Sequence, residues 1–188
     1  MIKKGSLLGL TLLLLFALTG CGSETVPQEK REQKTITVTD AAGRRVTLKH
    51  PVQRYAISTF DLIDFIIPLK GEEAFAMLKG VGDSGGKKNY DKVYEPRFPQ
   101  YKEQWKIISP HGAPFDVEAI LAAKPDVLIV NSVMQGHMYA MDIEPRLTEA
   151  GIALLLIDVP GKTTQSAQDL YRLLGKVFDE PERAEEVA

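Results

Sequence analysis

Two short segments near the beginning of the chain alternate polar and apolar residues, the apolar ones mostly β-branched. They are residues 35–39 (Thr-Ile-Thr-Val-Thr) and residues 45–48 (Arg-Val-Thr-Leu), and Asp40-Ala41-Ala42-Gly43 lies between them. A period of two is typical of a strand with one buried face. Turn-forming residues between two such segments favour a hairpin. The pattern therefore predicts a β-hairpin that precedes the rest of the domain.

Farther along, continuous apolar runs alternate with segments that have helical spacing. Residues 127–130 (Val-Leu-Ile-Val) and 152–157 (Ile-Ala-Leu-Leu-Leu-Ile) have the composition of strands buried on both faces of a parallel sheet. Residues 55–57 predict a third, shorter strand. Helices are expected over residues 60–69, 115–123, 143–150, 166–178 and 182–188. This alternation predicts an α/β fold with a mainly parallel sheet flanked by helices.

The amino terminus has the pattern of an export signal. Two lysines precede an apolar stretch over residues 7–18, which is shorter than the ~20 apolar residues of a membrane-spanning helix. The sequence Leu18-Thr19-Gly20-Cys21 at its end resembles the lipobox of bacterial lipoproteins. The resemblance implies that residues 1–20 are a lipoprotein signal peptide and that Cys21 is the lipidation site. The alternative is an ordinary signal peptide with a chance cysteine.

The residues between the signal and the domain are polar. Residues 21–34 carry too few apolar side chains to join a core, which predicts a flexible tether. Lipidation would place the chain outside the cytoplasm, anchored to the bacterial cell membrane. It would also leave no cysteine for a disulfide, because Cys21 is the only one. Loss of the two signal lysines shifts the formal charge from −2 to about −4, which argues against a nucleic-acid partner.

Most sequence motifs of catalytic machinery are absent. Residues 82–86 (Gly-Asp-Ser-Gly-Gly) have the spacing Gly-x-Ser-x-Gly, but the chain has no His-Glu-x-x-His pair and no cysteine besides Cys21 that could serve as a nucleophile. Its His, Cys, Asp and Glu residues do not have the spacing of a structural metal site. We therefore expect a binding protein without a resident cofactor, rather than an enzyme.

The order of motifs is similar to that of a family of transport proteins. Residues 35–47 resemble the opening hairpin of substrate-binding proteins of iron-siderophore, haem and cobalamin ABC importers, and Arg54 before a strand ending in Ser58 follows that pattern. Residues 80–84 match the next strand and loop. Residues 116–130, with their helix, Lys-Pro-Asp turn and buried strand, are the most specific match. The resemblance covers residues 35–188.

This resemblance implies a particular domain organisation. Members of the family have two lobes joined by one long helix and bind their ligand between the lobes. Residues 35–180 would be the amino-terminal, Rossmann-like lobe, and residues 181–188 the start of the interlobe helix. We expect the chain to be a fragment without the second lobe. We also expect residues 181–188 to be frayed, with Val187 exposed, because a short helix without packing is unstable.

The same resemblance suggests a role for Glu118. In the family, a glutamate at the matching position projects from the lobe and pairs with an arginine of the importer's membrane subunit, so the implied partner is an ABC permease. The alternative is an ordinary solvated surface carboxylate.

Ligand contacts are expected in loops at the carboxyl ends of the parallel strands. The candidates from the sequence are Ser58, Thr59, Phe60, Ser84, Asn131, Ser132, Met134, His137 and Tyr139. The hydroxyls of Ser58 and Thr59 could equally cap the helix that starts at Phe60.

Methionine, histidine and tyrosine are concentrated over residues 134–141. Such side chains ligate haem iron, and methionine lines sites for large flat ligands, so the run favours haem or another metal complex. The alternative is that Met138 and Met141 pack into the following helix while His137 is exposed.

Two functions compete on this evidence. The first is a membrane-anchored solute-binding component of an ABC importer for a siderophore complex, haem or cobalamin. The second is a lipoprotein that acts as an interaction or sensor subunit and does not itself transport.

Overall fold

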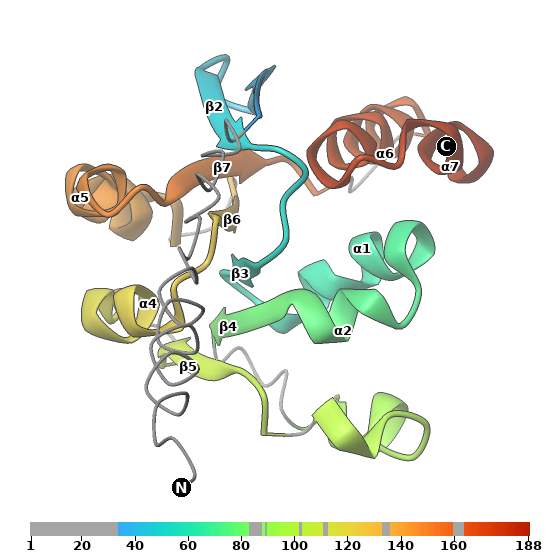
Figure 1. Cartoon of the computed structure of the whole chain (residues 1–188), viewed down its shortest axis with the longest axis horizontal. Coiled ribbons are helices and arrows are strands. Elements are labelled where there is room, and N and C mark those ends of the chain that lie inside the picture. The colour runs from blue at the N-terminus through green and yellow to red at the C-terminus, as the bar shows by residue number, and fades with distance from the viewer. Residues whose placement is uncertain are drawn as a thin grey trace, which may run out of the picture. The chain divides into compact units, whose positions relative to one another are not determined.

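A five-stranded parallel sheet with helices on both faces, and a separate two-stranded hairpin, form the described part of the chain (Figure 1). The computed structural model describes residues 34–82, 88, 90–101, 103–110, 113–132, 136–159 and 164–188. The strands are β1 (Thr35–Thr39), β2 (Arg45–Lys49), β3 (Tyr55–Ile57), β4 (Leu78–Gly82), β5 (Lys106–Ser109), β6 (Val127–Asn131) and β7 (Ala153–Ile157). The helices are α1 (Ile63–Lys70), α2 (Glu73–Met77), α4 (Val117–Ala123), α5 (Gly136–Glu149), α6 (Thr164–Phe178) and α7 (Pro181–Val187). Short helical turns are η1 (Phe60–Leu62), η2 (Tyr90–Tyr94) and η3 (Pro99–Tyr101).

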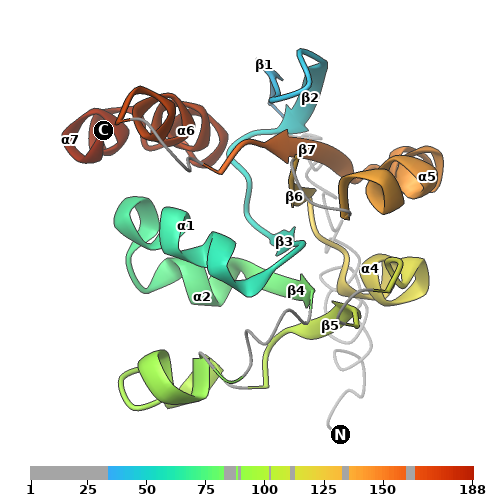
Figure 2. The ribbon, with the colours of Figure 1, turned by 180° about the vertical axis from the view of Figure 1, so that it is seen from behind.

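The large sheet has the strand order β5-β4-β3-β6-β7, and all its neighbouring strands pair in parallel. Every residue of β6 is buried. Successive side chains of a strand point to opposite faces, so Val127 and Ile129 join the core under α1 and α6, whereas Leu128 and Val130 join the core under α4 and α5. Figures 1 and 2 show these two helical layers on either side of the sheet. The predicted fold class is confirmed.

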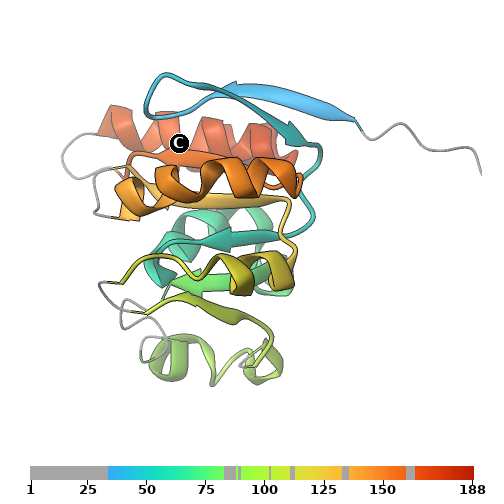
Figure 3. The ribbon, with the colours of Figure 1, turned by 90° about the vertical axis from the view of Figure 1, so that its left-hand side faces the viewer.

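The hairpin β1-β2 covers the free edge of β7. Its buried side chains Val38, Val46 and Leu48 face the core, and the backbone N–H of Ala41 donates to the carbonyl of Leu156 at 2.9 Å. Figure 3 shows the hairpin lying across this end of the sheet, beside α5 and α6. An edge strand that is covered in this way cannot pair with another chain.

Most predicted elements are present, with different bounds in places. Helix α5 begins at Gly136 rather than at Ile143. Strand β5 and helix α2 were not predicted, because both are short and β5 is largely exposed.

The carboxyl-terminal helix is packed. Ala184 of α7 is 1% exposed, and a Cβ built on Gly175 of α6 would lie 2.4 Å from the Cβ of Ala184. The absence of a side chain at Gly175 therefore allows the two helices to approach closely. Arg172 binds the carboxylate of Glu185 at 2.9 Å. Val187 is half-buried against the core, so the expected exposure of Val187 is wrong.

Candidate functional site

The strand order creates a switch point at the carboxyl ends of β3 and β6. From the central strand β3 the chain moves outward through β4 and β5, and then returns to the other side of β3 with β6. Loops that follow two such strands leave the sheet in opposite directions and open a crevice where ligands bind in open α/β sheets. The residues at this point are Ser58 and Thr59 after β3, and Asn131 and Ser132 at the end of β6.

Hydrogen bonds join these two strand ends. The backbone N–H of Asn131 donates to Oγ of Ser58 at 3.3 Å, and the N–H of Ser58 donates to the carbonyl of Ile129 at 2.9 Å. Ser58 and Asn131 are buried polar residues, 8% and 7% exposed. The N–H of Ser132 donates to the carbonyl of Ile157 at 2.7 Å and so ties the edge to β7. The predicted candidates Ser58, Asn131 and Ser132 are thus brought together.

Gly82 at the end of β4 belongs to the same edge. A Cβ built on Gly82 would lie 1.8 Å from the carbonyl oxygen of Ser58, so no other residue fits there without moving the backbone. This close approach brings the end of β4 against the residues that follow β3. In the sequence, only the family resemblance draws attention to Gly80-Val81-Gly82; the structure gives the steric reason for Gly82.

His137 lies in the first turn of α5 and points back to the strand end. Its Nδ1 is 3.1 Å from the carbonyl oxygen of Ser132. A carbonyl only accepts, so this contact assigns the proton to Nδ1 and leaves Nε2 of the neutral ring with a lone pair. His137 is half-buried and Met138 is 64% exposed. The alternative in which Met138 packs inward and His137 is exposed is therefore wrong.

Other predicted candidates lie differently. Thr59 stands at the start of η1 but makes no capping hydrogen bond with its side chain, and the Ser58 hydroxyl is bound to Asn131 instead, so the capping alternative is wrong. Phe60 is 2% exposed, which places its side chain in the core rather than at the surface of the site. Tyr139 is half-buried and packs against the core under α5. Cys21, Ser84 and Met134 lie outside the described residues.

An aromatic cluster beneath the β3 loop was not predicted. The Phe60 ring meets Tyr90 edge-on with centroids 6.0 Å apart, and Tyr90 meets Trp105 edge-on at 4.8 Å. Tyr94 donates a hydrogen bond to Asp64 of α1, and burial together with this carboxylate raises the pKa of the Tyr94 phenol. These rings are far apart in the sequence, and they pack against Phe60 in the segment that follows β3.

Glu118 lies on the exposed side of the α4/α5 layer. Asp116 begins α4, and its Oδ1 accepts a hydrogen bond from the N–H of Ala119 at 3.0 Å. Glu118 follows in the first turn, with its side chain 77% exposed, and binds Nη2 of Arg146 on α5 at 2.6 Å. Another protein could therefore reach Glu118, but its carboxylate is already bound to Arg146 of the same chain.

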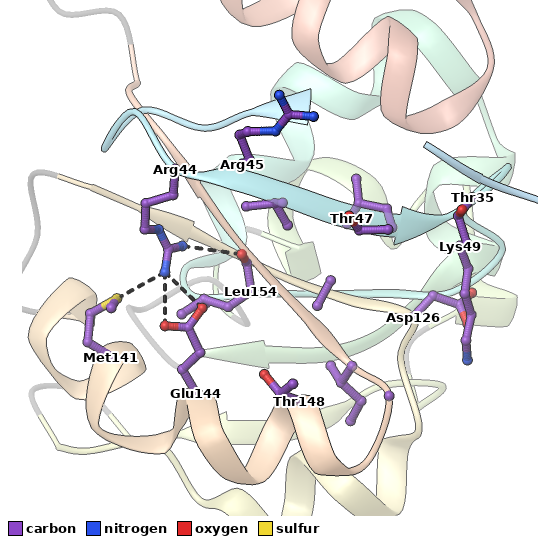
Figure 4. A pocket seen from close by; sticks show the side chains of 15 residues that line it. Thr35, Arg44, Arg45, Thr47, Lys49, Asp126, Met141, Glu144, Thr148 and Leu154 are labelled. Atoms are coloured by element: carbon purple, nitrogen blue, oxygen red, sulfur yellow. Dashed lines mark hydrogen bonds and ion pairs between the residues drawn. The ribbon is translucent and has the colours of Figure 1, made fainter. Parts of the chain in front are cut away.

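A groove of about 550 Å³ lies between the hairpin and α5, away from the carboxyl edge (Figure 4). Arg44 binds Glu144 at one end, and Lys49 lies 3.6 Å from Asp126 at the other. The groove runs beside the start of β7 and contains none of the predicted site residues. It is therefore distinct from the switch-point site.

Two further observations concern metals and membranes. Within the described ranges, no three His, Cys, Asp or Glu side chains are grouped so that they could hold a metal ion. The helices described in the structure include none that is long and apolar enough to span a bilayer.

Comparison with known proteins gives matches among solved structures alone. Neither a protein-family model nor a curated protein matches the chain. The TroA-like periplasmic binding protein FepB from Veillonella parvula matches with a TM-score of 0.69 and 26% identity, over 81% of this chain and 45% of that one. A periplasmic solute-binding protein from Veillonella parvula DSM 2008 has a TM-score of 0.66 and 24% identity, over 82% and 44%. The Haemophilus influenzae protein MolA, bound to molybdate, has a TM-score of 0.62 and 19% identity, over 81% and 49%.

Further matches include a siderophore-binding protein with ferric acinetobactin bound and a haem-binding protein. This chain spans less than half of the length of each of these five structures. The described residues therefore have the fold of part of a TroA-like periplasmic solute-binding protein.

Proposed function

We propose that this chain is the amino-terminal lobe of the solute-binding component of an ABC importer. The observation that carries the proposal is the switch point, where Ser58, Asn131, Ser132 and His137 meet at the carboxyl edge of a fold shared with periplasmic binding proteins. The residues at this edge offer hydrogen bonds and one imidazole, which suits capture of a polar solute rather than chemistry on it.

The ligand that we propose is a metal complex of the siderophore, haem or cobalamin type. Support comes from His137, because an imidazole whose Nδ1–H is held by a carbonyl presents Nε2 as a ligand for a metal centre. The matched structures include binders of a ferric siderophore and of haem. Imidazole suits iron and other transition metals.

Ligand capture can be tested with haem, a ferric siderophore and cobalamin. The chain has one tryptophan, Trp105, whose fluorescence reports binding by quenching. Because one lobe leaves most of the ligand solvated, we expect weak binding, with quenching by one of the three only at high ligand concentration, and less quenching in His137→Ala. The matched control is His50→Ala, which changes a half-buried histidine that lies 3.6 Å from Asp179. Tight binding of one of the three compounds by residues 21–188 would contradict the interpretation of the chain as a single lobe, and equal quenching in wild type and His137→Ala would contradict the role of His137.

The proposed location is outside the cytoplasm, at the membrane surface, through a lipid on Cys21. The lipobox resemblance of residues 18–21 supports it. Labelling cells with radioactive palmitate should mark the protein, and Cys21→Ser should abolish the label and release the protein from the membrane fraction. Ser23→Ala is the control and should keep both properties. Unchanged membrane association of the serine variant would rule out the anchor.

Docking on the permease is proposed to use Glu118. Its exposure and its place in the first turn of α4 support this role. A Glu118→Arg variant should lower uptake of the solute without changing its binding, because it would place two cations face to face. Unchanged uptake would contradict docking through Glu118 and would favour the function as an interaction or sensor subunit.

A further inference from the structure

Glu118 and Arg146 form an ion pair that faces solvent. Nη2 of Arg146 donates to Oε1 of Glu118 at 2.6 Å, and their side chains are 55% and 77% exposed. The two residues come from different helices, α5 and α4, and are 28 residues apart in the sequence. The carboxylate proposed to meet a permease arginine is thus already held by an arginine of its own chain.

Arg146 has other carboxylates within reach on its own helix. Asp142 and Glu149 lie four residues before and three residues after it, and both are exposed. Residues at these spacings are neighbours on a helix surface. Among the ion pairs of the described residues, neither carboxylate is bound to Arg146. Arg146 can therefore leave Glu118 and still find an opposite charge one turn away.

Exchange between these partners costs little. Exposed ion pairs contribute little to stability, because water screens them and ordering two long side chains costs entropy. A competing guanidinium in a drier interface would gain more from Glu118 than Arg146 does. The pair with Arg146 is thus strong enough to orient Glu118 and weak enough to be displaced.

We propose that Arg146 is an internal competitor that regulates the docking of this protein. In the free protein it binds Glu118. On docking, Glu118 passes to a guanidinium of the permease, and Arg146 passes to Asp142 or Glu149. The proposal rests on the docking role proposed for Glu118. It assigns to Arg146 the positioning of that carboxylate and a limit on the strength of docking.

Removal of Arg146 should tighten docking. In Arg146→Gln the carboxylate has no partner to give up, so we expect about two- to fivefold tighter binding, the range that an exposed pair allows. Glu118→Gln should weaken binding by at least about tenfold. The double variant Glu118→Gln/Arg146→Gln should bind the permease with the affinity of Glu118→Gln alone, because Arg146 acts through Glu118.

The measurement is the equilibrium affinity of the full chain for the membrane subunits of the ABC importer that it is proposed to serve, reconstituted in lipid nanodiscs. The control is Arg172→Gln, which removes the same charge from another exposed pair, Arg172–Glu185, and should leave the affinity unchanged. Asp142→Asn with Glu149→Gln removes the alternative partners of Arg146 and should weaken docking about twofold or more. Thermal unfolding of each variant checks that the fold is intact.

The outcomes separate the two proposals. Unchanged affinity of Glu118→Gln would end the docking function and the competitor with it. A loss in Glu118→Gln with no gain in Arg146→Gln would leave docking in place and overturn the competitor. A gain of affinity in Arg172→Gln, or in the double variant Glu118→Gln/Arg146→Gln, as large as that in Arg146→Gln would mean that net charge alone explains the effect. This outcome also overturns the role of Arg146.

Discussion

One guanidinium nitrogen of Arg44, Nη1, donates hydrogen bonds to both carboxylate oxygens of Glu144, at 2.8 and 2.9 Å. The same side chain binds Asp40, whose carboxylate is fully buried, through Nε at 2.8 Å, and reaches the carbonyl of Leu154 on β7 at 3.3 Å. Arg44 therefore connects the hairpin turn, α5 and the edge strand (Figure 4).

Replacement of Arg44 by alanine should destabilise the fold by about 3 kcal/mol, because it leaves the Asp40 carboxylate buried without its cation. Urea unfolding followed by circular dichroism measures this. Arg45→Ala, next in the sequence and exposed, is the control and should change the free energy of unfolding by less than about 0.5 kcal/mol. Equal effects of the two variants would mean that Arg44 does not stabilise the hairpin.

The hydroxyl of Ser58 is predicted to stabilise the switch point. Ser58→Ala removes the acceptor for the buried N–H of Asn131 and should cost about 1 kcal/mol or more. Thr59→Ala is the matched control, because this hydroxyl makes no capping bond, and should cost less than about 0.5 kcal/mol. The free energies of unfolding of both variants can be measured with urea. A larger decrease in Thr59→Ala than in Ser58→Ala would support the capping interpretation.

Gly175 is predicted to be essential for the packing of α7. Gly175→Ala should destabilise by about 1–3 kcal/mol, because the added methyl group meets the Cβ of Ala184 and the carbonyl of Glu180. Hydrogen exchange should show that α7 loses protection first. Lys176→Ala changes the neighbouring, exposed position and should leave protection intact. Normal protection in the glycine variant would contradict the close contact.

Attachment of α7 should depend on acid pH. The hydrogen bond from Arg172 lowers the pKa of the Glu185 carboxyl below its ordinary value of 4.5. A carboxyl with a lowered pKa stabilises the folded state above its unfolded pKa, and this stabilisation is lost as the pH falls through the folded value. Amide protection in α7 should therefore be constant above the ordinary carboxyl pKa of 4.5 and fall as the pH drops below it.

The variant Glu185→Gln should show reduced α7 protection already at neutral pH, and a smaller further loss in acid. Glu182→Gln, an exposed carboxylate of the same helix, should behave like the unmodified chain. Equal pH dependence in both variants would assign the effect to other groups.

Elements with a long apolar pattern were predictable from the sequence, and short ones were not. Residues 127–130 lie in an interior strand of the sheet and residues 153–157 in its covered edge strand, both largely buried, and their hydrophobicity alone indicates them. Strand β5 has one buried residue, Ile108, and pairs with β4 only, so no local pattern indicates it. The start of α5 at Gly136 was not predicted, because Met138 and Met141 are exposed, so the apolar residues at the beginning of this helix do not follow its buried side.

The candidate site was predictable in location and less so in detail. Strand ends give Ser58, Asn131 and Ser132, because carboxyl ends of parallel strands share one edge. The orientation of His137 depends on a carbonyl five residues earlier, and the burial of Phe60 depends on Tyr90 and Trp105, far along the chain. The Glu118–Arg146 pair joins two helices, so neither helix alone indicates it.

The covering of β7 by the hairpin has a consequence for the order of folding. Arg44 and Leu154, which touch across this contact, are 110 residues apart in the chain. Bringing such distant segments together costs loop-closure entropy, and non-local contacts of this kind slow folding. Because synthesis runs from the amino terminus, the first strands to be made wait for the last strand before they gain their packing. The hairpin is thus expected to dock late, after the parallel sheet has formed.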